Sequence, residues 1–144
     1  MGRYAASATS TAGSSTLPIA ALVGSTSCRP KIIEIGCSNT SSTTAVSIAV
    51  RRITTAGTPG TGLTESPEAG TNDVAAIATA FNTYSSTGPT LSDELRRATL
   101  GPLAGIVWTF SGEGLVIPTT ANAGVALIPT GTGQACDFWF VWDE

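Results

Sequence analysis

Apolar residues that alternate with small or polar residues are the feature that most constrains the fold of this chain. In the segment 43–53, a β-branched aliphatic residue occupies every second position from Val46 to Val50. This spacing is typical of a β-strand with one buried face. Residues 31–38 alternate in a similar way, and the polar residues 39–42 lie between the two segments. We therefore expect these strands to pair as a hairpin through a short turn.

The alternation returns towards the end of the sequence. Phe138, Phe140 and Trp142 fall on one face of the last predicted strand, and Trp139 falls on the other. Both faces of this strand are therefore expected to be covered. Between the first pair of strands and the end of the chain, the pattern predicts strands near residues 106–110, 115–117, 125–128 and 135–142.

Three segments lack a clear strand pattern. Residues 56–72 contain glycine, proline and threonine with almost no apolar residue, which predicts a long surface loop. Residues 73–81 have near-helical apolar spacing, and Asn72 or Asp73 can cap a short helix there, although the alanine and threonine content fits an extended segment equally. Residues 92–100 fit either a helical turn or a crossing between two sheets.

Short strands separated by turn residues at intervals of about ten residues are typical of all-β domains. We therefore expect an all-β fold, an antiparallel β-sandwich of jelly-roll kind with long loops and at most one or two short helices. A length of 144 residues corresponds to one domain. Residues 17–144 are expected to form that single β-sandwich domain, and residues 1–16 either an arm that orders against a neighbour or the first strand.

The composition predicts a largely uncharged surface. Charged residues make up 12% of the chain, against about 25% in an average soluble protein. A surface of Thr, Ser, Ala and Gly suits a protein that is packed in an assembly. The net charge of −3 provides no cationic surface for nucleic acid. A membrane-spanning helix needs about 20 consecutive apolar residues, and no stretch of the chain is that long. No segment resembles a signal peptide either, so we expect no membrane partner.

The absence of histidine argues against catalysis, because it removes the commonest general base near neutral pH and the commonest metal ligand. The one lysine, Lys31, lies in a predicted strand rather than in a Ser-x-x-Lys arrangement. Cys28, Cys37 and Cys136 contain no CxxC pair and are expected to be small buried residues. We expect no enzyme activity, no cofactor and no metal site.

The tryptophans leave a binding function open. Many carbohydrate-binding modules hold sugars on an exposed aromatic side chain of a β-sandwich, and such a module is an alternative interpretation of this chain. Trp139 alternates with Phe138 and Phe140, so each face of this strand fits a core or a protein interface as well as a sugar site.

Three features resemble the small β-sandwich proteins of tailed-bacteriophage particles. They are the opening Met-Gly-Arg-Tyr of residues 1–4 before a Ser/Thr/Ala segment, the apolar segments around Ile33 and residues 46–52, and the aromatic strand that ends at Trp142. In size and composition the chain is most similar to the head decoration (cement) proteins. The resemblance implies a homotrimer on the outer capsid surface of the virion, assembled in the host cytoplasm, that bridges major capsid subunits.

A phage tail, neck or fibre-adaptor protein is the second interpretation within the same class. Under the decoration hypothesis, the N-terminal arm is the first candidate for contact with a neighbour, and loop 56–72 is the second. Removal of residues 1–16 is then expected to weaken capsid binding without unfolding the domain. The residues expected to contact a partner are Tyr4, Thr9, Thr11, Arg51, Thr58, Pro59, Leu63 and Arg96.

Overall fold

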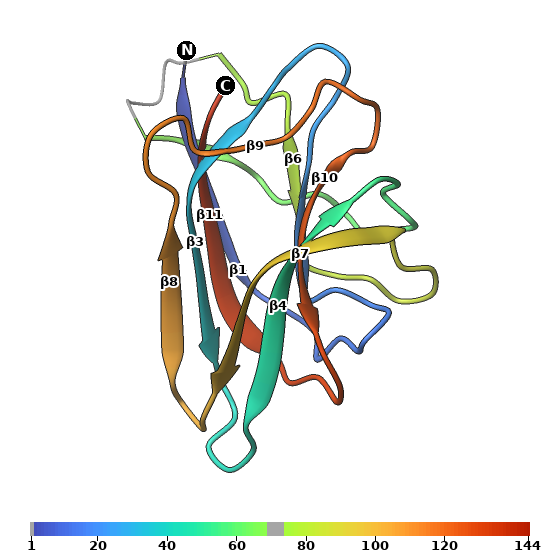
Figure 1. Ribbon diagram of the computed structural model, residues 1–144, viewed down its shortest axis with the longest axis vertical. Helices are drawn as coiled ribbons and strands as arrows, with labels where there is room; N and C mark the ends of the chain where they lie inside the picture. Colours follow the sequence, from blue (N-terminus) through green and yellow to red (C-terminus); the bar gives the residue numbers. More distant parts are fainter. Residues whose placement is uncertain (1, 69–73) are drawn as a thin grey trace.

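A computed structural model describes residues 2–68 and 74–144, and this part of the chain contains eleven strands and no helix. Two antiparallel sheets pack face to face as a β-sandwich (Figure 1). The strands are β1 (Arg3–Thr9), β2 (Ala20–Val23), β3 (Lys31–Asn39), β4 (Val46–Ile53), β5 (Ser66–Pro67), β6 (Thr79–Phe81), β7 (Leu91–Leu100), β8 (Gly105–Thr109), β9 (Leu115–Val116), β10 (Gly124–Pro129) and β11 (Cys136–Asp143).

The strand order is that of a jelly roll. One sheet, called sheet A, has the order β5-β1-β11-β3-β8 with β9 beside β3, and the other, sheet B, has the order β6-β2-β10-β4-β7. Without the short strands β5, β6 and β9, two four-stranded sheets remain whose strands interleave in sequence, as in a double Greek key. The predicted all-β, jelly-roll-like sandwich is therefore confirmed.

The main core lies between the two sheets. The alternation read from the sequence of β11 places Phe138, Phe140 and Trp142 inward, where each is at most 1% exposed. They belong to one apolar cluster with Ile48 and Val50 of β4 in the opposite sheet. Burial of large side chains of this kind is the main favourable term in the folding of the domain.

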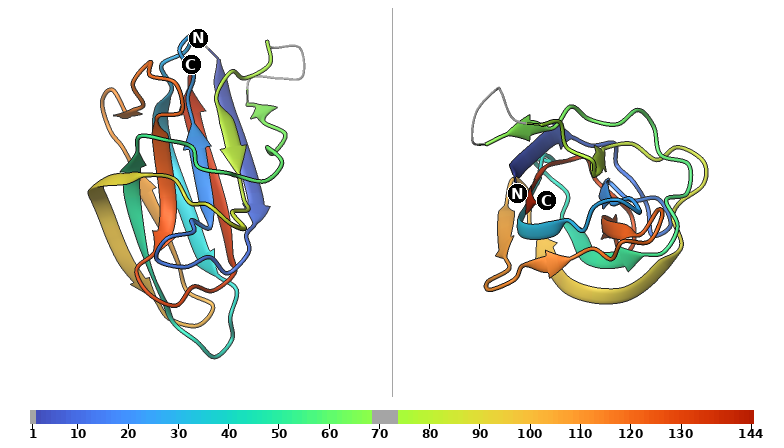
Figure 2. Two further views of the ribbon diagram at one scale, coloured as in Figure 1. Left: turned by 90° about the vertical axis from the view of Figure 1, so that its right-hand side faces the viewer. Right: turned by 90° about the horizontal axis from the view of Figure 1, so that it is seen from above.

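A second, smaller core covers the outer face of sheet B. Tyr84 is buried there against Ala21, Ile53 and Ala126, whose side chains point away from the main core. The long loop after β4 crosses outside sheet B (Figure 2). Three backbone hydrogen bonds of 2.8–2.9 Å tie this loop to the segment around β6, from Thr58 to Thr87, from Gly60 to Thr83 and from Leu63 to Ala80.

The predicted hairpin between residues 31–38 and 43–53 is wrong. β3 lies in sheet A between β11 and β8, whereas β4 lies in sheet B between β10 and β7. Both strands have an inward apolar face, so each can pack against the other across the core instead of pairing with it. The turn residues after Asn39 form a crossing from one sheet to the other.

Neither of the two segments that allowed a helix is helical in its described residues, and residues 74–78 are irregular. Residues 79–81 form β6, and residues 91–100 form β7, which pairs with β4 along most of its length. The proposed caps Asn72 and Asp73 lie outside the described residues. β2 was not predicted, because all four of its residues are buried and its apolar run shows no alternation.

Of the two alternatives for the N-terminal segment, the structure contains the strand. β1 pairs with β11 from Arg3 opposite Asp143 to Thr9 opposite Asp137. Tyr4 and Ala6 point into the core. Removal of residues 1–16 would therefore expose the side of β11 and remove core side chains, which contradicts the expectation that the fold survives the truncation.

Tyr84 gives the fold a pH-dependent stability. Among the described residues its buried hydroxyl has no hydrogen-bond partner, and burial raises the pKa of Tyr84 to about 12. The usual tyrosine pKa is about 10, so between these values the hydroxyl ionises in the unfolded chain only. Stability is therefore lost as the pH rises from about 10 to about 12.

We expect Tyr84→Phe to remove this loss, and to leave stability at neutral pH unchanged or higher by about 1 kcal/mol. Urea unfolding of the unchanged protein and of Tyr84→Phe at about pH 8 and about pH 11 measures how much stability each loses at high pH. Comparison of the two proteins cancels other alkaline effects. An equal fall in stability of both proteins at high pH would contradict the assignment.

Candidate functional site

Four loops form the end of the sandwich opposite the two chain ends, and we call it the distal end (Figure 1). It lies where β1 stops and β11 starts, because these strands are antiparallel. Not one of its residues carries a charge. The loops of the distal end are residues 10–16, 40–45, 101–104 and 130–135.

Asn39 joins two of these loops from a buried position at the end of β3. Asn39 is only 1% exposed. Its Nδ2 donates to the carbonyl of Thr44 at 2.8 Å and to that of Gly101 at 3.2 Å. Its Oδ1 accepts the N–H of Ser41 at 3.0 Å, and its own N–H donates to the carbonyl of Ala104 at 2.9 Å. This asparagine therefore fixes the geometry of both loops.

The other two loops join the same assembly. The N–H and the hydroxyl of Thr40 both donate to the carbonyl of Ala135, at 3.2 and 2.7 Å. The backbone at Gly133 lies so close to residues 12 and 13 that a Cβ there would be 1.8 Å from the carbonyl oxygen of Ala12. The distal end is therefore one connected surface rather than four separate loops.

Leu103 projects from this surface in a strained conformation. Its φ is 56°, a left-handed value that costs a non-glycine residue about 1–2 kcal/mol. Its side chain is 67% exposed, and its N–H donates to the carbonyl of Ser41 at 3.0 Å. This φ belongs to a turn in which the N–H of Ala104 donates to the carbonyl of Gly101 at 3.1 Å, so the turn fixes the direction of the Leu103 side chain.

The side chains of the distal end are uncharged and, apart from Leu103 and Gln134, small. It has no ionisable side chain, so it offers neither a general acid nor a general base. The centres of protein interfaces are depleted of charged residues and contain apolar anchors. The distal end shares the lack of charge, and Leu103 is the large apolar side chain that it exposes.

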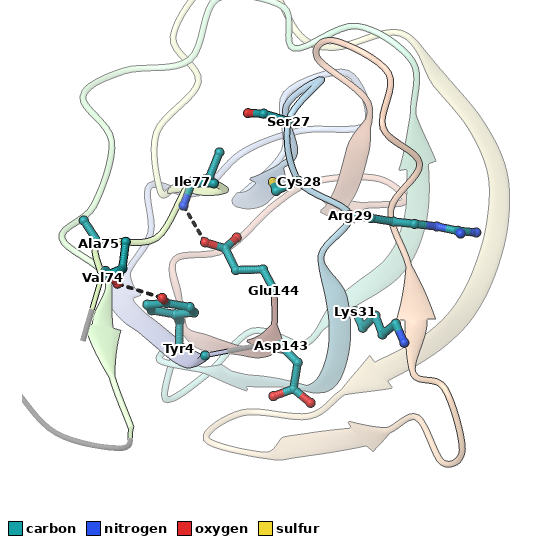
Figure 3. Close-up of a pocket in the computed structure, with 11 residues that line it drawn as sticks. Tyr4, Ser27, Cys28, Arg29, Lys31, Val74, Ala75, Ile77, Asp143 and Glu144 are labelled. Carbon is teal, nitrogen blue, oxygen red and sulfur yellow. Dashed lines mark hydrogen bonds between the residues drawn. The ribbon is translucent and has the colours of Figure 1, made fainter.

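A cavity of about 680 Å³ lies at the opposite end, near the chain ends (Figure 3). Figure 3 shows the Glu144 carboxylate turned towards Ile77. Its Oε1 accepts the N–H of Ile77 at 2.5 Å, and its Oε2 accepts from the N–H of Ala78 at 3.1 Å and from Trp142 Nε1 at 3.3 Å. The carboxylate is thus engaged in holding the segment before β6 against the end of β11.

The other charged groups around this cavity do not converge. The Arg29 side chain points away from the cavity (Figure 3). Arg3 Nε donates to Asp143 at 2.7 Å, and this hydrogen bond lowers the pKa of Asp143. Within residues 2–68 and 74–144, no group of three cysteine, aspartate or glutamate side chains is placed to hold a metal ion.

The three cysteines are buried, and none forms a disulfide. A hydrogen bond with Cys136, together with burial, raises the pKa of the Cys37 thiol. Cys28 lies in the wall of the cavity near the chain ends, next to Ser27 (Figure 3). Their positions match the prediction of small buried residues.

The structure does not bring the predicted contact residues together. Tyr4 is a core residue, 5% exposed, with its ring stacked on Trp142 at 5.9 Å and its hydroxyl donating to the carbonyl of Val74. It is therefore not available to a partner on the surface. Thr9 and Thr11 are exposed beside and within the distal end.

The remaining predicted residues lie on other sides of the sandwich. The Arg51 guanidinium donates to the carbonyl of Ser92 at 2.6 and 3.2 Å, and that of Arg96 lies 5.5 Å from the ring centre of Phe110. Thr58, Pro59 and Leu63 belong to the loop that covers sheet B. The prediction missed Leu103, although the absence of charge in residues 101–105 was visible in the sequence.

Comparisons of the chain with protein-family models, with curated proteins and with solved structures find no match. The described residues include no helix of the length and hydropathy needed to cross a membrane. The candidate site therefore rests on the geometry of this chain.

Replacement of Asn39 tests whether it holds the distal end. Asn39→Leu removes the side-chain partner of the N–H of Ser41 and of the carbonyls of Thr44 and Gly101, three part-buried hydrogen bonds, so we expect a loss of about 2 kcal/mol in the free energy of unfolding. Urea unfolding measures the loss. Ser38→Ala, one residue earlier and facing outward, is the matched control and should change stability by less than about 0.5 kcal/mol. Equal stabilities of the two variants would refute the role of Asn39.

Proposed function

We propose that this protein is a structural component of a virus particle that binds the outer capsid surface through its distal end. In this proposal it is a decoration protein, a homotrimer that bridges neighbouring major capsid subunits and stabilises the head. The observation that carries the proposal is the charge-free distal end with its exposed, strained Leu103.

The distal end suits a large protein partner. Its polar groups are neutral hydroxyls, backbone groups and the Gln134 amide, and removal of these from water costs much less than removal of charges. Its internal hydrogen bonds fix its shape before binding, so little loop entropy is lost on contact. The opposite end of the sandwich carries Arg3, Arg29, Asp143 and Glu144 and is less suited to a dry interface.

The fold supports the same class of function. Jelly rolls with this strand order occur in viral capsid proteins as well as in lectin domains and cupins. Fold alone does not decide among them, because one fold hosts many functions. A chain without histidine lacks the usual metal ligand of an enzyme site, and an uncharged docking surface favours the structural role.

Attachment by a symmetric oligomer explains how one small patch is sufficient. Each copy of 14.5 kDa presents one distal end, and a trimer presents three in a fixed arrangement. Once one copy is bound, the others bind at a high effective concentration, so weak single contacts add up to firm attachment. A tail or neck adaptor would use the same kind of contact with another partner.

Exchange of Leu103 for asparagine tests the proposed contact. Asparagine tolerates a left-handed φ, so Leu103→Asn should keep or raise the melting temperature while it removes the apolar side chain. We expect at least about a tenfold loss of affinity for capsids assembled from the major capsid protein of the same genome. Co-sedimentation over a range of concentrations measures the affinity.

Val74→Asn is the matched control, because Val74 is 80% exposed at the end opposite to Leu103. It should bind capsids like the unchanged protein. An equal loss in both variants, unchanged binding of Leu103→Asn, or failure of the unchanged protein to sediment with capsids would each contradict the proposal. Sedimentation with purified tails instead of heads would favour the adaptor interpretation.

A further inference from the structure

The outer face of sheet A carries a tryptophan that the distal end does not use. Trp139 of β11 lies opposite Ser7 of β1 on one side and Gly36 of β3 on the other. Gly36 in turn lies opposite Val107 of β8, so the four residues form one row across the face. Trp139 is half-buried and Val107 is 49% exposed, and within residues 2–68 and 74–144 no loop comparable to that outside sheet B crosses the outer face of sheet A.

The indole of Trp139 lies flat against the sheet because Gly36 has no side chain. A Cβ at residue 36 would lie 2.0 Å from Cε2 and 2.1 Å from Cζ2 of the indole. At the ring edge, Nε1 donates to Glu34 Oε1 at 2.6 Å. The ring is fixed from below and at its edge, so it presents its other face outward. We call this arrangement the Trp139 platform.

Polar side chains surround the platform. Neighbours two positions along the same or the adjacent strand lie within about 7–8 Å and point to the same side. Thr9 donates its hydroxyl hydrogen to Asp137 Oδ1 at 2.5 Å, which fixes one of these groups. The polar residues around the platform on this outward face are Ser7, Thr9, Glu34, Ser38, Thr109 and Asp137.

We propose that the Trp139 platform binds a ring of a neutral sugar. A sugar ring presents C–H groups on its face and hydroxyl groups around its edge. The C–H face fits the exposed indole, as an apolar body fits an aromatic surface. The hydroxyls fit the rim, because carboxylates accept hydrogen bonds and serine and threonine hydroxyls both donate and accept them. The indole N–H is already used by Glu34, so the ring face is the contact that remains.

The charges of the rim favour a neutral sugar over other occupants. Glu34 and Asp137 repel phosphate, which excludes a nucleic-acid strand stacked on the indole. A protein surface laid over the platform would bury both carboxylates, and a buried carboxylate is costly unless it is paired. Sugar hydroxyls supply hydrogen bonds to carboxylates without such a loss.

This inference is independent of the proposed function. The platform lies on the side of the sandwich, and the distal end lies at its tip (Figure 1). A protein bound to a capsid by its distal end leaves the side of sheet A open. Each binding activity can therefore be lost without the other.

Tryptophan fluorescence tests the proposal with the intact protein. Trp108 and Trp142 are buried, so a ligand-dependent change in emission reports Trp139. The probes are four neutral polysaccharides, namely dextran, laminarin, mannan and arabinogalactan, with anionic heparin as the contrast. We expect saturable quenching by at least one neutral polysaccharide and none by heparin.

Variants assign the site. In affinity electrophoresis with the bound polysaccharide, Trp139→Ala should lower the affinity at least about tenfold. Gly36→Ala should also weaken binding, because the added Cβ displaces the ring. Leu103→Asn is the control and should bind the polysaccharide normally. The proposal is overturned if no neutral polysaccharide binds, if heparin binds equally well, or if a folded Trp139→Ala variant, checked by circular dichroism, keeps its affinity.

Discussion

The pairing of β1 with β11 is the interaction on which the rest of the structure depends. It joins the two ends of the sequence over seven residue pairs and places the most buried aromatic side chains of β11 in the middle of sheet A. The jelly roll closes only when this pairing forms, and its contacts are separated by most of the chain length. The same pairing brings loops 10–16 and 130–135 together at the distal end and fixes the outward row that contains Trp139.

The outer faces of the two sheets differ in how much of the chain covers them. This difference determines which surfaces can bind a partner. Sheet B is covered by the chain itself, with Tyr84 and the long loop as the cover, so the loop has a structural reason for its length. In the described part of the chain, no loop crosses the outer face of sheet A. The functional proposals therefore concern the open face and the distal end, where side chains remain available after the domain has folded.

Local pattern was sufficient for the fold class and for most strands, because alternation reports burial directly. It failed where the outcome depended on partners far away in sequence. The strands 31–39 and 46–53 have hairpin-like spacing, yet they lie in opposite sheets, where their partners β8, β11, β7 and β10 all come from the second half of the sequence. Strand 20–23 is buried on both faces and has no alternation to detect. The sequence pattern could not predict the distal end as one surface, because it consists of four loops that are far apart in the sequence and that only the topology brings together.

The most direct test of the central claim is a cryo-electron microscopy reconstruction of capsids assembled from the major capsid protein of the same genome and incubated with this protein. The proposal predicts density for the sandwich on the outer capsid surface, with Leu103 and the other distal loops against the major capsid protein and both chain ends pointing away. Particles that lack the protein, or contact through the end that contains Glu144, would contradict it.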